Sequence, residues 1–249
     1  MKEPGPDQRD SSNWKDASHA SGEVKVRALS SRSTLTPKDL GVVPVSPSTV
    51  RHVIETQHYL RSMPAACVAC FGVFAGGQLM GAVVLTPGAR QGYKLLSAGR
   101  PDHFVTLARL WLTDELPRNS ESRVLSIVTR HLRRHTRYRL CLTYADPAAG
   151  HTGTIYRAAG WLYLGPTGPG GYIELADGQL HHPRTIFTQF GTNRVNHLLA
   201  TGVAARRQRI GGKHRYACVL DPSWRWRLRP DPQPYPVVRE RGPPAVDRP

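Results

Sequence analysis

The stretch Phe104–Leu164 decides the fold of this chain of 249 residues, and it opens with FVTLARLWLT (Phe104–Thr113). This run of apolar and β-branched residues has one basic interruption, and LCLTYA (Leu140–Ala145) is a second run of the same kind. Runs of this length and composition are typical of buried strands. Between them, Glu121–His135 carries apolar residues at three- and four-residue spacing and arginines elsewhere, which predicts an amphipathic helix.

The second half of the stretch predicts another helix and another strand. The small-residue turn Asp146–Gly153 leads into a short helix from Thr154 to Ala159. Gly160 suits the C-cap of that helix, and Trp161–Leu164 begins a further strand. Two short connections of this kind make a parallel or mixed sheet with helices packed on it. The sequence therefore predicts an α/β core.

Further elements are expected on both sides of this core. Pro47–Arg61 predicts a capped helix, and Gly76-Gly77 predicts a hairpin within Ala65–Thr86. Gly81 predicts a bulge or a close backbone approach. The remaining expectations are a surface loop at Pro87–Asp102, a hairpin formed by Tyr172–Leu175 and Gln179–His181, two short helices within Arg184–Ala200 separated at Gly191, and a last core strand at Tyr216–Leu220.

Composition divides the chain into three parts. Residues 1–45 hold few large apolar side chains and are expected to form a disordered tail. Residues 46–220 are expected to form one catalytic domain around a single core, and residues 221–249 a basic tail rich in Pro and Arg. Trp224 and Trp226 stand between arginines there, an alternation that can clamp phosphates and stack on exposed bases. The alternative for the residues after 230 is a disordered tail of biased composition.

The charge of the chain favours a polyanionic partner. Lys and Arg number 34 against 18 Asp and Glu, which gives a formal net charge of +16. Nucleic acid is the usual partner of such a protein, although a genome that favours Arg codons would produce the same excess. The residues expected to contact DNA are Arg206, Arg207 and Arg209 in a predicted basic turn, with Lys213 and Arg215 after it.

Cysteine spacing and hydropathy indicate the compartment. Cys67, Cys70, Cys141 and Cys218 do not form the doubled pair of a structural zinc site, and buried thiols are expected instead. Reduced thiols fit a cytoplasmic protein. No stretch approaches the roughly 20 apolar residues of a membrane span, and the polar N-terminus has no signal-peptide core, so no membrane association is expected.

Arg109 and Asp146 are the first candidates for chemistry. Arg109 interrupts a strand predicted to be buried, where a charge is costly unless it is paired or faces a cleft. Asp146 ends the neighbouring strand, where ligands gather in open α/β sheets, and we expect the two side chains to converge. Tyr156, on the first turn of the next helix, can direct its hydroxyl towards Asp146. The alternative is a plain ion pair that holds two strands together.

Four motifs stand out in and after the predicted core: LPRNSES at Leu116–Ser122, YADPAAGHTGTIYRAAGWLYLG at Tyr144–Gly165, HPRTIF at His182–Phe187 and KHRY at Lys213–Tyr216. They resemble the Mom family of phage DNA-modification proteins, a divergent branch of the GNAT acyltransferase fold. The resemblance covers about residues 49–220 and implies a mixed central sheet with helices on both faces. It implies conversion of the exocyclic amine of adenine in DNA to a carbamoylmethylated form, which shields phage DNA from restriction nucleases.

The resemblance also implies functional residues. It marks Arg109, Ser122, Asp146 and Tyr156, with Tyr59 as a further match. Because an iron(II) ion has been suggested for the family, His58, Tyr59 and Asp146 are candidate ligands; their spacing alone predicts no metal. Further candidate ligands are His151, His181, His182 and His214.

The turn before the predicted helix at Glu121–His135 occupies the place where the GNAT fold holds a cofactor pyrophosphate. Here it reads Pro117-Arg118-Asn119-Ser120-Glu121-Ser122, without the usual glycines, and Glu121 puts a negative charge where a phosphate would lie. Coenzyme A binding is therefore not expected. Arg118 could still recruit a smaller anion, and Asn119 and Ser120 offer polar groups to a substrate or cap the helix.

The sequence thus predicts a DNA-modifying transferase with a small-molecule donor of unknown identity, encoded by a phage or prophage and acting on double-stranded DNA in the host cytoplasm. The target adenine must leave the base stack, so a pocket is required. Two alternatives remain, a DNA-binding protein without catalysis and an N-acetyltransferase that uses acetyl-coenzyme A. The aromatic residues that could wall the pocket, most of them expected in the core, are Trp111, Tyr144, Trp161 and Tyr163.

Overall fold

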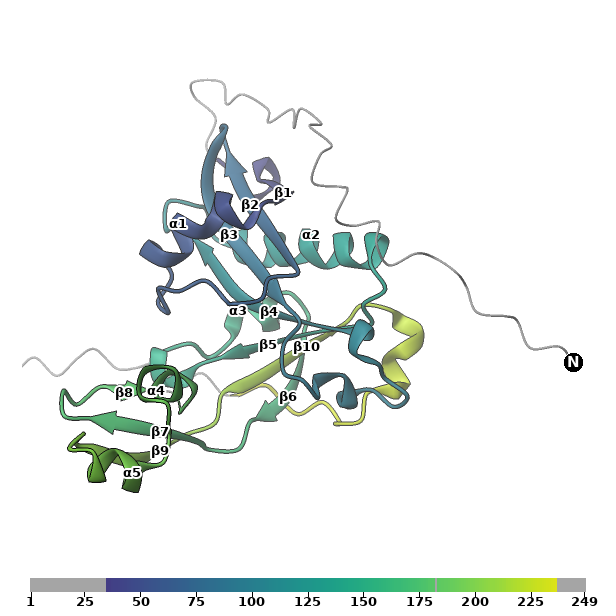
Figure 1. The fold of residues 1–249 in the computed structure, drawn as a ribbon. Helices are drawn as coiled ribbons and strands as arrows, with labels where there is room; N and C mark the ends of the chain where they lie inside the picture. Colours follow the sequence, from purple (N-terminus) through teal and green to yellow (C-terminus); the bar gives the residue numbers. More distant parts are fainter. Residues whose placement is uncertain (1–34, 182, 237–249) are drawn as a thin grey trace, which may run out of the picture. The chain divides into compact units, whose positions relative to one another are not determined.

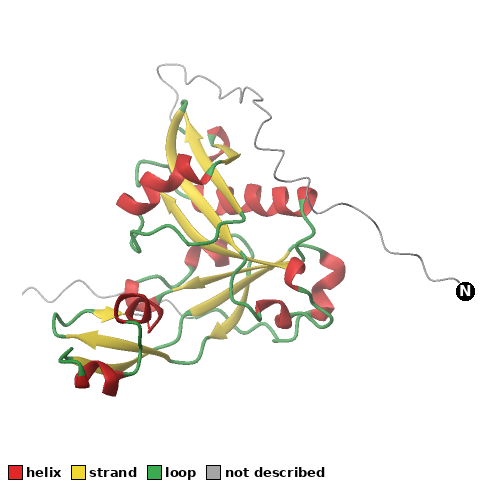
Figure 2. Ribbon diagram, viewed as in Figure 1, coloured by secondary structure: helices red, strands yellow, loops and turns green. Residues whose placement is uncertain are grey.

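The computed structural model describes residues 35–181 and 183–236 (Figure 1). The chain forms two compact units. Unit 1 comprises Met1–Cys141 and Val219–Leu228, and unit 2 comprises Leu142–Cys218 and Arg229–Pro249. Both units contain strands and helices, so the predicted α/β class is confirmed (Figure 2).

Unit 1 is built on four strands that neighbour one another in the order β1-β2-β3-β4, each antiparallel to the next. Gly76 and Gly77 form the tight turn between β2 and β3 with positive φ angles, as the hairpin prediction requires. A Cβ atom on Gly81 would lie 2.7 Å from the carbonyl oxygen of Trp111, so the predicted close approach is confirmed. The strands are β1 (Gly41–Val45), β2 (Ala69–Ala75), β3 (Gln78–Thr86) and β4 (Phe104–Leu112).

Two helices cover these strands, α1 (Pro47–Gln57) and α2 (Ser120–His135). Val50 and Ile54 of α1 are buried against a cluster that includes Cys70 of β2. The next residue of β2, Phe71, makes an edge contact with His131 of α2 at 5.1 Å between ring centroids. Because successive strand residues point to opposite faces, α1 and α2 lie on opposite faces of the sheet in unit 1.

Short 3-10 helices complete unit 1. One of them, Pro222–Arg227, is fixed to the unit by a bridge between Leu96 and Leu228 and by a hydrogen bond from Ser97 N to Arg227 O at 2.7 Å. The 3-10 helices are η2 (Pro37–Asp39), η3 (Gly92–Leu95), η4 (Pro101–His103) and η6 (Pro222–Arg227).

Unit 2 contains two groups of strands. In the first, the order is β5-β10-β6, with β10 antiparallel to β6 and α3 following β5 along the chain. In the second, β8 and β9 flank β7, both antiparallel to it, and Ile173, Ile186 and Leu198 form a core with α4 and α5. The elements are β5 (Leu140–Ala145, which begins in unit 1), η5 (Pro147–Ala149), α3 (Thr154–Ala158), β6 (Leu162–Pro166), β7 (Gly170–Leu175), β8 (Leu180–His181), α4 (Pro183–Phe190), α5 (Val195–Ala200), β9 (Ala205–Ile210) and β10 (His214–Val219).

Most of the predicted elements are confirmed, and four differences are informative. Strand β1 lies in the part predicted to be a tail, because Val42 and Val43 pair with the edge of β2. Helix α1 ends at Gln57, since His58 is extended and its Nδ1 accepts from Leu60 N. Residues 205–210 form a strand and not a turn, because six of their positions pair with β7. Residues 222–227 form the ordered η6.

Some predictions concern residues that the structure does not describe. The predicted disorder of residues 1–34 and 237–249 lies outside the described residues, as does His182. Within residues 35–181 and 183–236, the helices are too short or too polar to cross a membrane.

Candidate active site

Asp146 and Lys213 form an ion pair in unit 2. Asp146 follows the last residue of β5, Lys213 precedes β10, and these two strands are neighbours. The Oδ2 atom of Asp146 lies 2.8 Å from Nζ of Lys213, and the carboxylate side chain is only 17 % exposed. The carbonyl oxygen of Asp146 accepts from Ala149 N and His151 N, so the turn that follows wraps around this residue. The arrangement presents a partly buried carboxylate that is held by an ammonium group.

Tyr156 belongs to an aromatic cluster beside this turn. Its ring lies 5.5 Å from Trp161 and 5.3 Å from Tyr216 between centroids, and its side chain is buried. The Tyr156 hydroxyl accepts from Thr143 Oγ1 at 3.3 Å, and Thr143 precedes Asp146 by three residues on β5. The hydroxyl therefore connects α3 to the strand that ends at Asp146.

Tyr216 fixes the end of the turn. Its hydroxyl donates to the carbonyl oxygen of Thr152 at 2.6 Å, and burial raises the pKa of Tyr216 to about 12. Gly153 lies against the same ring with a positive φ of 82°, and a Cβ atom there would lie 2.7 Å from the Tyr216 hydroxyl oxygen. The turn after Asp146 is thus packed on a rigid aromatic surface.

Trp161 and Tyr163 are core residues, as most of the proposed pocket walls were expected to be. They are 2 % and 5 % exposed. The Tyr163 hydroxyl lies 2.7 Å from Nδ1 of His214, and burial raises the pKa of Tyr163 although Arg215 lowers it. Their rings stabilise unit 2.

Arg109 is the candidate charged residue of unit 1, as Asp146 is that of unit 2. Its Nε donates to the carbonyl oxygen of Ser62 at 3.0 Å, and Nη1 donates to that of Ala108 at 2.9 Å. Nη2 reaches Ser62 Oγ at 3.4 Å. Burial lowers the pKa of the Arg109 guanidinium, while Tyr59 and Cys67 raise it. The acceptors that the structure gives this cation are neutral oxygens.

The polar turn before α2 differs from the predicted cap. Asn119 is left-handed with φ of 72°, and its side chain makes no capping hydrogen bond. Ser120 Oγ donates to Pro117 O at 2.6 Å, and Ser122 Oγ donates to Asn119 O at 3.0 Å. The prediction that Asn119 or Ser120 is the N-cap is therefore confirmed for the position of Asn119, but the predicted side-chain hydrogen bond is wrong. Arg118 is exposed.

Comparisons with known proteins identify the family. The Mom protein family matches residues 39–237. The chain is 30 % identical over 208 residues to "Methylcarbamoylase mom" of Escherichia phage Mu, covering 80 % of this chain and 84 % of that protein. The chain belongs to the Mom protein family.

Solved structures similar to this Mom family chain include N-acetyltransferases. One is the N-acetyltransferase from Staphylococcus aureus Mu50, at 12 % identity and a TM-score of 0.40, covering 73 % of this chain and 97 % of that one. Another is spermidine N-acetyltransferase from Vibrio cholerae, at 9 % identity and a TM-score of 0.42, covering 75 % and 97 %.

The residues that the Mom family resemblance marks lie in both units. Arg109 and Ser122 are in unit 1, and Asp146 and Tyr156 are in unit 2. The structure gives Arg109 and Asp146 partners within their own units, and the predicted convergence of the two side chains stays a prediction. Lys213, predicted to contact DNA, pairs with Asp146, and no local sequence signal indicates this pair.

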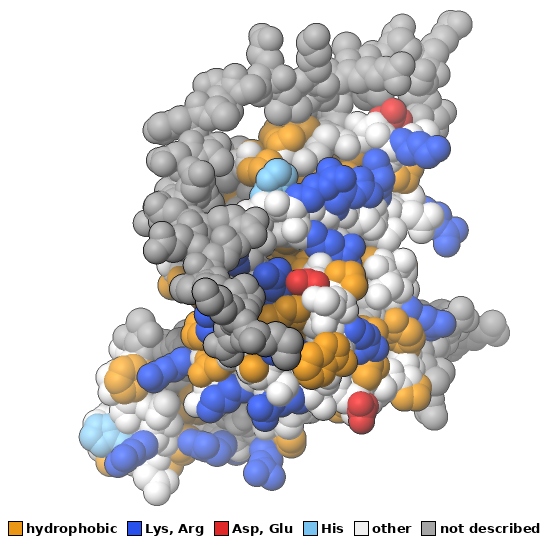
Figure 3. Space-filling view, turned by 90° about the vertical axis from the view of Figure 1, so that its right-hand side faces the viewer, with side chains coloured by type: hydrophobic (Ala, Val, Ile, Leu, Met, Phe, Trp, Pro, Cys, Tyr) orange, Lys and Arg blue, Asp and Glu red, His pale blue; other side chains and the backbone are white. Residues whose placement is uncertain are grey.

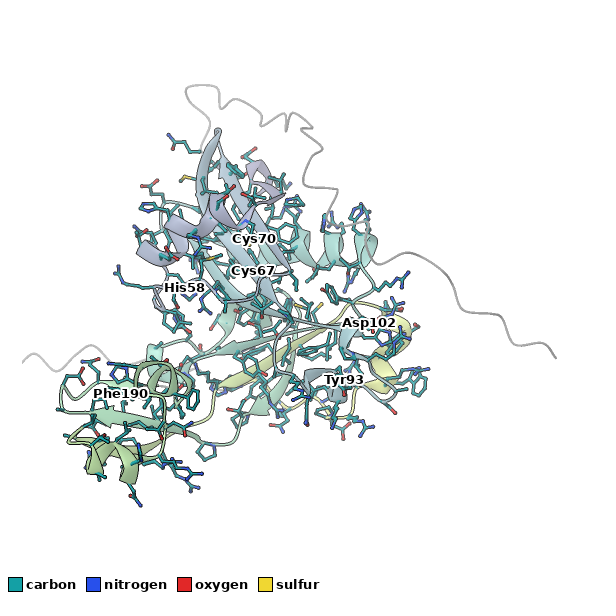
Figure 4. The ribbon with its side chains drawn as sticks, in the orientation of Figure 1. His58, Cys67, Cys70, Tyr93, Asp102 and Phe190 are labelled. Atoms are coloured by element: carbon teal, nitrogen blue, oxygen red, sulfur yellow. The ribbon has the colours of Figure 1, made fainter. Side chains whose placement is uncertain are left out.

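The candidate iron ligands His58 and Tyr59 follow α1. His58 is buried, its Nδ1 is engaged by Leu60 N, and its ring lies 4.6 Å from that of the exposed Tyr59. Figure 4 shows His58 at the end of α1, in the part of unit 1 where Cys67 and Cys70 lie. Over residues 35–181 and 183–236, no three or more His, Cys, Asp and Glu side chains form a group that could hold a metal. The iron(II) site proposed at His58, Tyr59 and Asp146 stays a prediction.

All four cysteines are free thiols, and their predicted burial is confirmed for two of them. Cys70 and Cys141 are buried, whereas Cys67 and Cys218 are half-buried. Burial and the neighbouring Cys67 raise the pKa of the Cys70 thiol to about 12. At neutral pH this thiol is therefore protonated and a poor nucleophile.

The arginines expected to contact DNA have different surroundings. Arg206 pairs with Glu174 at 2.9 Å, and Arg215 donates to the carbonyl oxygen of Leu164 at 2.7 Å. Arg207 and Arg209 are exposed on β9. Arg206 is exposed as well, with 72 % of its side chain accessible, whereas Arg215 is half-buried.

Two open hollows lie on the α4–α5 part of unit 2, with volumes of about 540 and 660 Å³. They share Arg194 and His197, and the larger one reaches Arg207. Neither is lined by Asp146 or Tyr156. They are distinct from the Asp146 turn.

Proposed function

We propose that this protein is a transferase that converts the exocyclic amine of adenine in double-stranded DNA to a carbamoylmethylated form and thereby protects phage DNA from restriction. The observation that carries this proposal is the 30 % identity to a methylcarbamoylase of phage Mu, which extends over 80 % of the chain. The family match spans residues 39–237 and so includes all of the residues given roles below.

Asp146 is the proposed general base. As the amine of adenine forms a C–N bond to the transferred carbon, the bond from that carbon to the donor's leaving group breaks and its electron pair departs with the leaving group. One N–H proton must also leave, and a carboxylate can accept it. Lys213 Nζ, 2.8 Å from Oδ2, holds this carboxylate in a fixed position. Because the Asp146 side chain is only slightly exposed, water competes less with the substrate amine for this carboxylate.

Tyr156 is the proposed proton relay. Its hydroxyl already takes part in a hydrogen bond with Thr143, on the strand that leads to Asp146. A phenol hydroxyl can donate one hydrogen bond while it accepts another. A group that relays a proton to a neighbouring general base needs both abilities. Ser122, whose hydroxyl donates to Asn119 O, is the proposed polar contact for a substrate.

Arg109 is the proposed anchor for the donor molecule. Its guanidinium carries a charge that its neutral acceptors do not compensate. A planar guanidinium binds carboxylate, phosphate or carbonyl oxygens through paired N–H groups. Arg118, Asn119 and Ser120 would bind a small anionic part of the donor in the same proposal, without coenzyme A.

The test is mass spectrometry of nucleosides from plasmid DNA isolated after expression of the full chain. Wild-type protein should produce carbamoylmethylated adenine, and Asp146→Asn should produce almost none. Asp177→Asn is the matched control, because Asp177 is an exposed carboxylate of a turn in unit 2 and Asn also suits that turn. Ordinary adenine after wild-type expression, together with salt-sensitive DNA binding, would favour the alternative of a non-catalytic DNA-binding protein.

A further inference from the structure

The segment Pro222–Arg227 (PSWRWR) arranges two indoles and a guanidinium in a stack on unit 1. The guanidinium carbon of Arg227 lies 4.6 Å from the ring centroid of Trp224 and 4.7 Å from that of Trp226. Trp226 is 75 % exposed, the largest value among the exposed large hydrophobic residues described. An indole in this state offers a free face to a ligand.

The stack is rigid. Asp221 accepts from Ser223 N at 3.0 Å and from Ser223 Oγ at 2.7 Å, which fixes the start of η6. Arg139 pairs with Asp221 at 3.3 Å, and its guanidinium carbon lies 5.8 Å from the ring centroid of Trp224. Leu228 is buried and closes the segment against Leu96. Because the backbone that carries Trp226 is held on both sides, less conformational entropy is lost on binding than from a free chain.

The surroundings of the stack are basic. Arg133 of α2 donates to the carbonyl oxygen of Val219, which places the C-terminal part of α2 beside the segment that leads into η6. Two acidic side chains of unit 1, Asp102 and Asp221, are both paired with arginines. Figure 3 shows Lys and Arg side chains spread over the visible face, with few Asp and Glu. The exposed arginines of these segments are Arg130, Arg133, Arg134, Arg137 and Arg225.

We propose that Trp226 stacks on an unpaired base of a DNA strand while Arg225 and Arg227 hold the phosphates beside it. The alternation of planar aromatic and cationic side chains complements a strand in which planar bases alternate with anionic phosphates. Base stacking occurs without a sequence code, because every base has an aromatic face. This inference rests on the proposed function, in which DNA is the substrate.

An unpaired base is the fitting ligand because a duplex leaves no base face open along its length. The proposed reaction requires the target adenine to leave the stack, and opening exposes the faces of that base and its neighbours. An exposed indole that binds an opened base would favour this state over the closed duplex. The stack would therefore assist base opening.

The experiment measures tryptophan fluorescence of the full-length protein during titration with oligothymidylate, inorganic polyphosphate or polyglutamate. Oligothymidylate should bind and quench the emission, because stacking on a base quenches an indole, whereas polyphosphate should bind without that quenching. Trp226→Ala should lose the quenching and bind oligothymidylate about 5- to 100-fold more weakly, with little change for polyphosphate. Trp226→Phe should recover part of the affinity.

Leu199→Ala is the matched control, because Leu199 is another exposed large apolar side chain, at 53 % exposure. It should bind every probe as the wild type does. Equal oligothymidylate affinity for wild type and Trp226→Ala would overturn the proposal, and so would Trp226-dependent binding of polyglutamate, which would indicate an acidic protein partner.

Binding and modification can fail separately. Trp226-dependent binding without any modified adenine would overturn the proposed reaction and leave the stacking surface standing. Full modification by Trp226→Ala, together with unchanged binding, would overturn the stacking surface and leave the reaction standing.

Discussion

Arg109 in unit 1 and Asp146 in unit 2 are both charged residues in or next to strands, yet their surroundings differ. The Arg109 guanidinium donates to carbonyl and hydroxyl oxygens, which orient it without neutralising its charge. The Asp146 carboxylate has the Lys213 ammonium at 2.8 Å. The first arrangement suits recognition of an anionic or strongly polar ligand. The arrangement at Asp146 suits a neutral substrate group such as an amine, because Lys213 already balances the charge of the carboxylate.

The largest effect should come from Asp146→Asn, which removes the proton acceptor and keeps the size of the side chain. The yield of modified adenine should fall by about 100-fold or more, the ordinary contribution of a general base. The measurement is the ratio of modified to ordinary adenine in plasmid DNA at matched protein levels. A yield above half of the wild-type value would exclude the general-base role.

Arg109→Gln tests the other side of the comparison. The loss of an uncompensated cation should lower the yield by about 10- to 100-fold if it anchors the donor, and Arg109→Lys should restore only part because a lysine lacks the planar fork. Lost hydrogen bonds should also lower the free energy of unfolding by about 1–3 kcal/mol, which urea unfolding would measure.

The control for Arg109 is Arg100→Gln, in which an exposed arginine of the same unit loses its pairing with Asp102. It should leave the yield unchanged. Equal yields for Arg109→Gln and Arg100→Gln would show that the Arg109 charge serves structure alone.

Lys213→Met decides which partner Lys213 serves. If the lysine holds Asp146, the yield should fall by about tenfold and Lys213→Arg should restore most of it. If it contacts DNA instead, the affinity should fall for all sequences and the salt dependence of binding should decrease by about one charge. DNA binding at several salt concentrations, measured beside the nucleoside yield, separates the two.

Tyr216→Phe should have the smallest effect on activity and a clear effect on stability. At pH 8 the free energy of unfolding should fall by about 1–2 kcal/mol, because the carbonyl oxygen of Thr152 loses its buried donor. The pKa of Tyr216 is raised from 10.0 to about 12, so the folded state favours the neutral phenol. That contribution is complete below pH 10 and is lost as the pH rises towards 12.

Urea unfolding at pH 8 and pH 11 checks this prediction. The wild type should lose stability between the two values through Tyr216, whereas Tyr216→Phe lacks this loss. A wild type and variant with parallel pH dependence would show that Tyr216 ionises as readily in the folded state as in the unfolded chain.

More of the fold than of the candidate site could be predicted from the sequence. The strands at Phe104–Leu112 and Leu140–Ala145 and the helix between them were predicted because local apolar periodicity determines them. Strand β9 was mistaken for a turn, because arginines at its exposed positions hide the alternation. The pair of Asp146 and Lys213 depends on β10 lying beside β5, an order that the local pattern does not contain.

The polar turn before α2 shows another limit. Asn119 and Ser120 are residue types that cap helices, and the sequence offered both. In the structure Asn119 has a left-handed backbone, and the Ser120 and Ser122 hydroxyls donate to backbone carbonyl oxygens. Which hydrogen bond such a side chain makes depends on the backbone angles as well as on the residue type.

The division of the chain has a practical consequence for dissecting this protein. The polypeptide passes between the units after Cys141, after Cys218 and after Leu228, and the first two of these points fall inside β5 and β10. Neither unit can be produced from a single uninterrupted gene fragment, and cleavage at either of those two points would cut through a strand near one of its ends. Complementation between separately expressed halves is therefore a poor strategy, and point variants of the whole chain are the better tool.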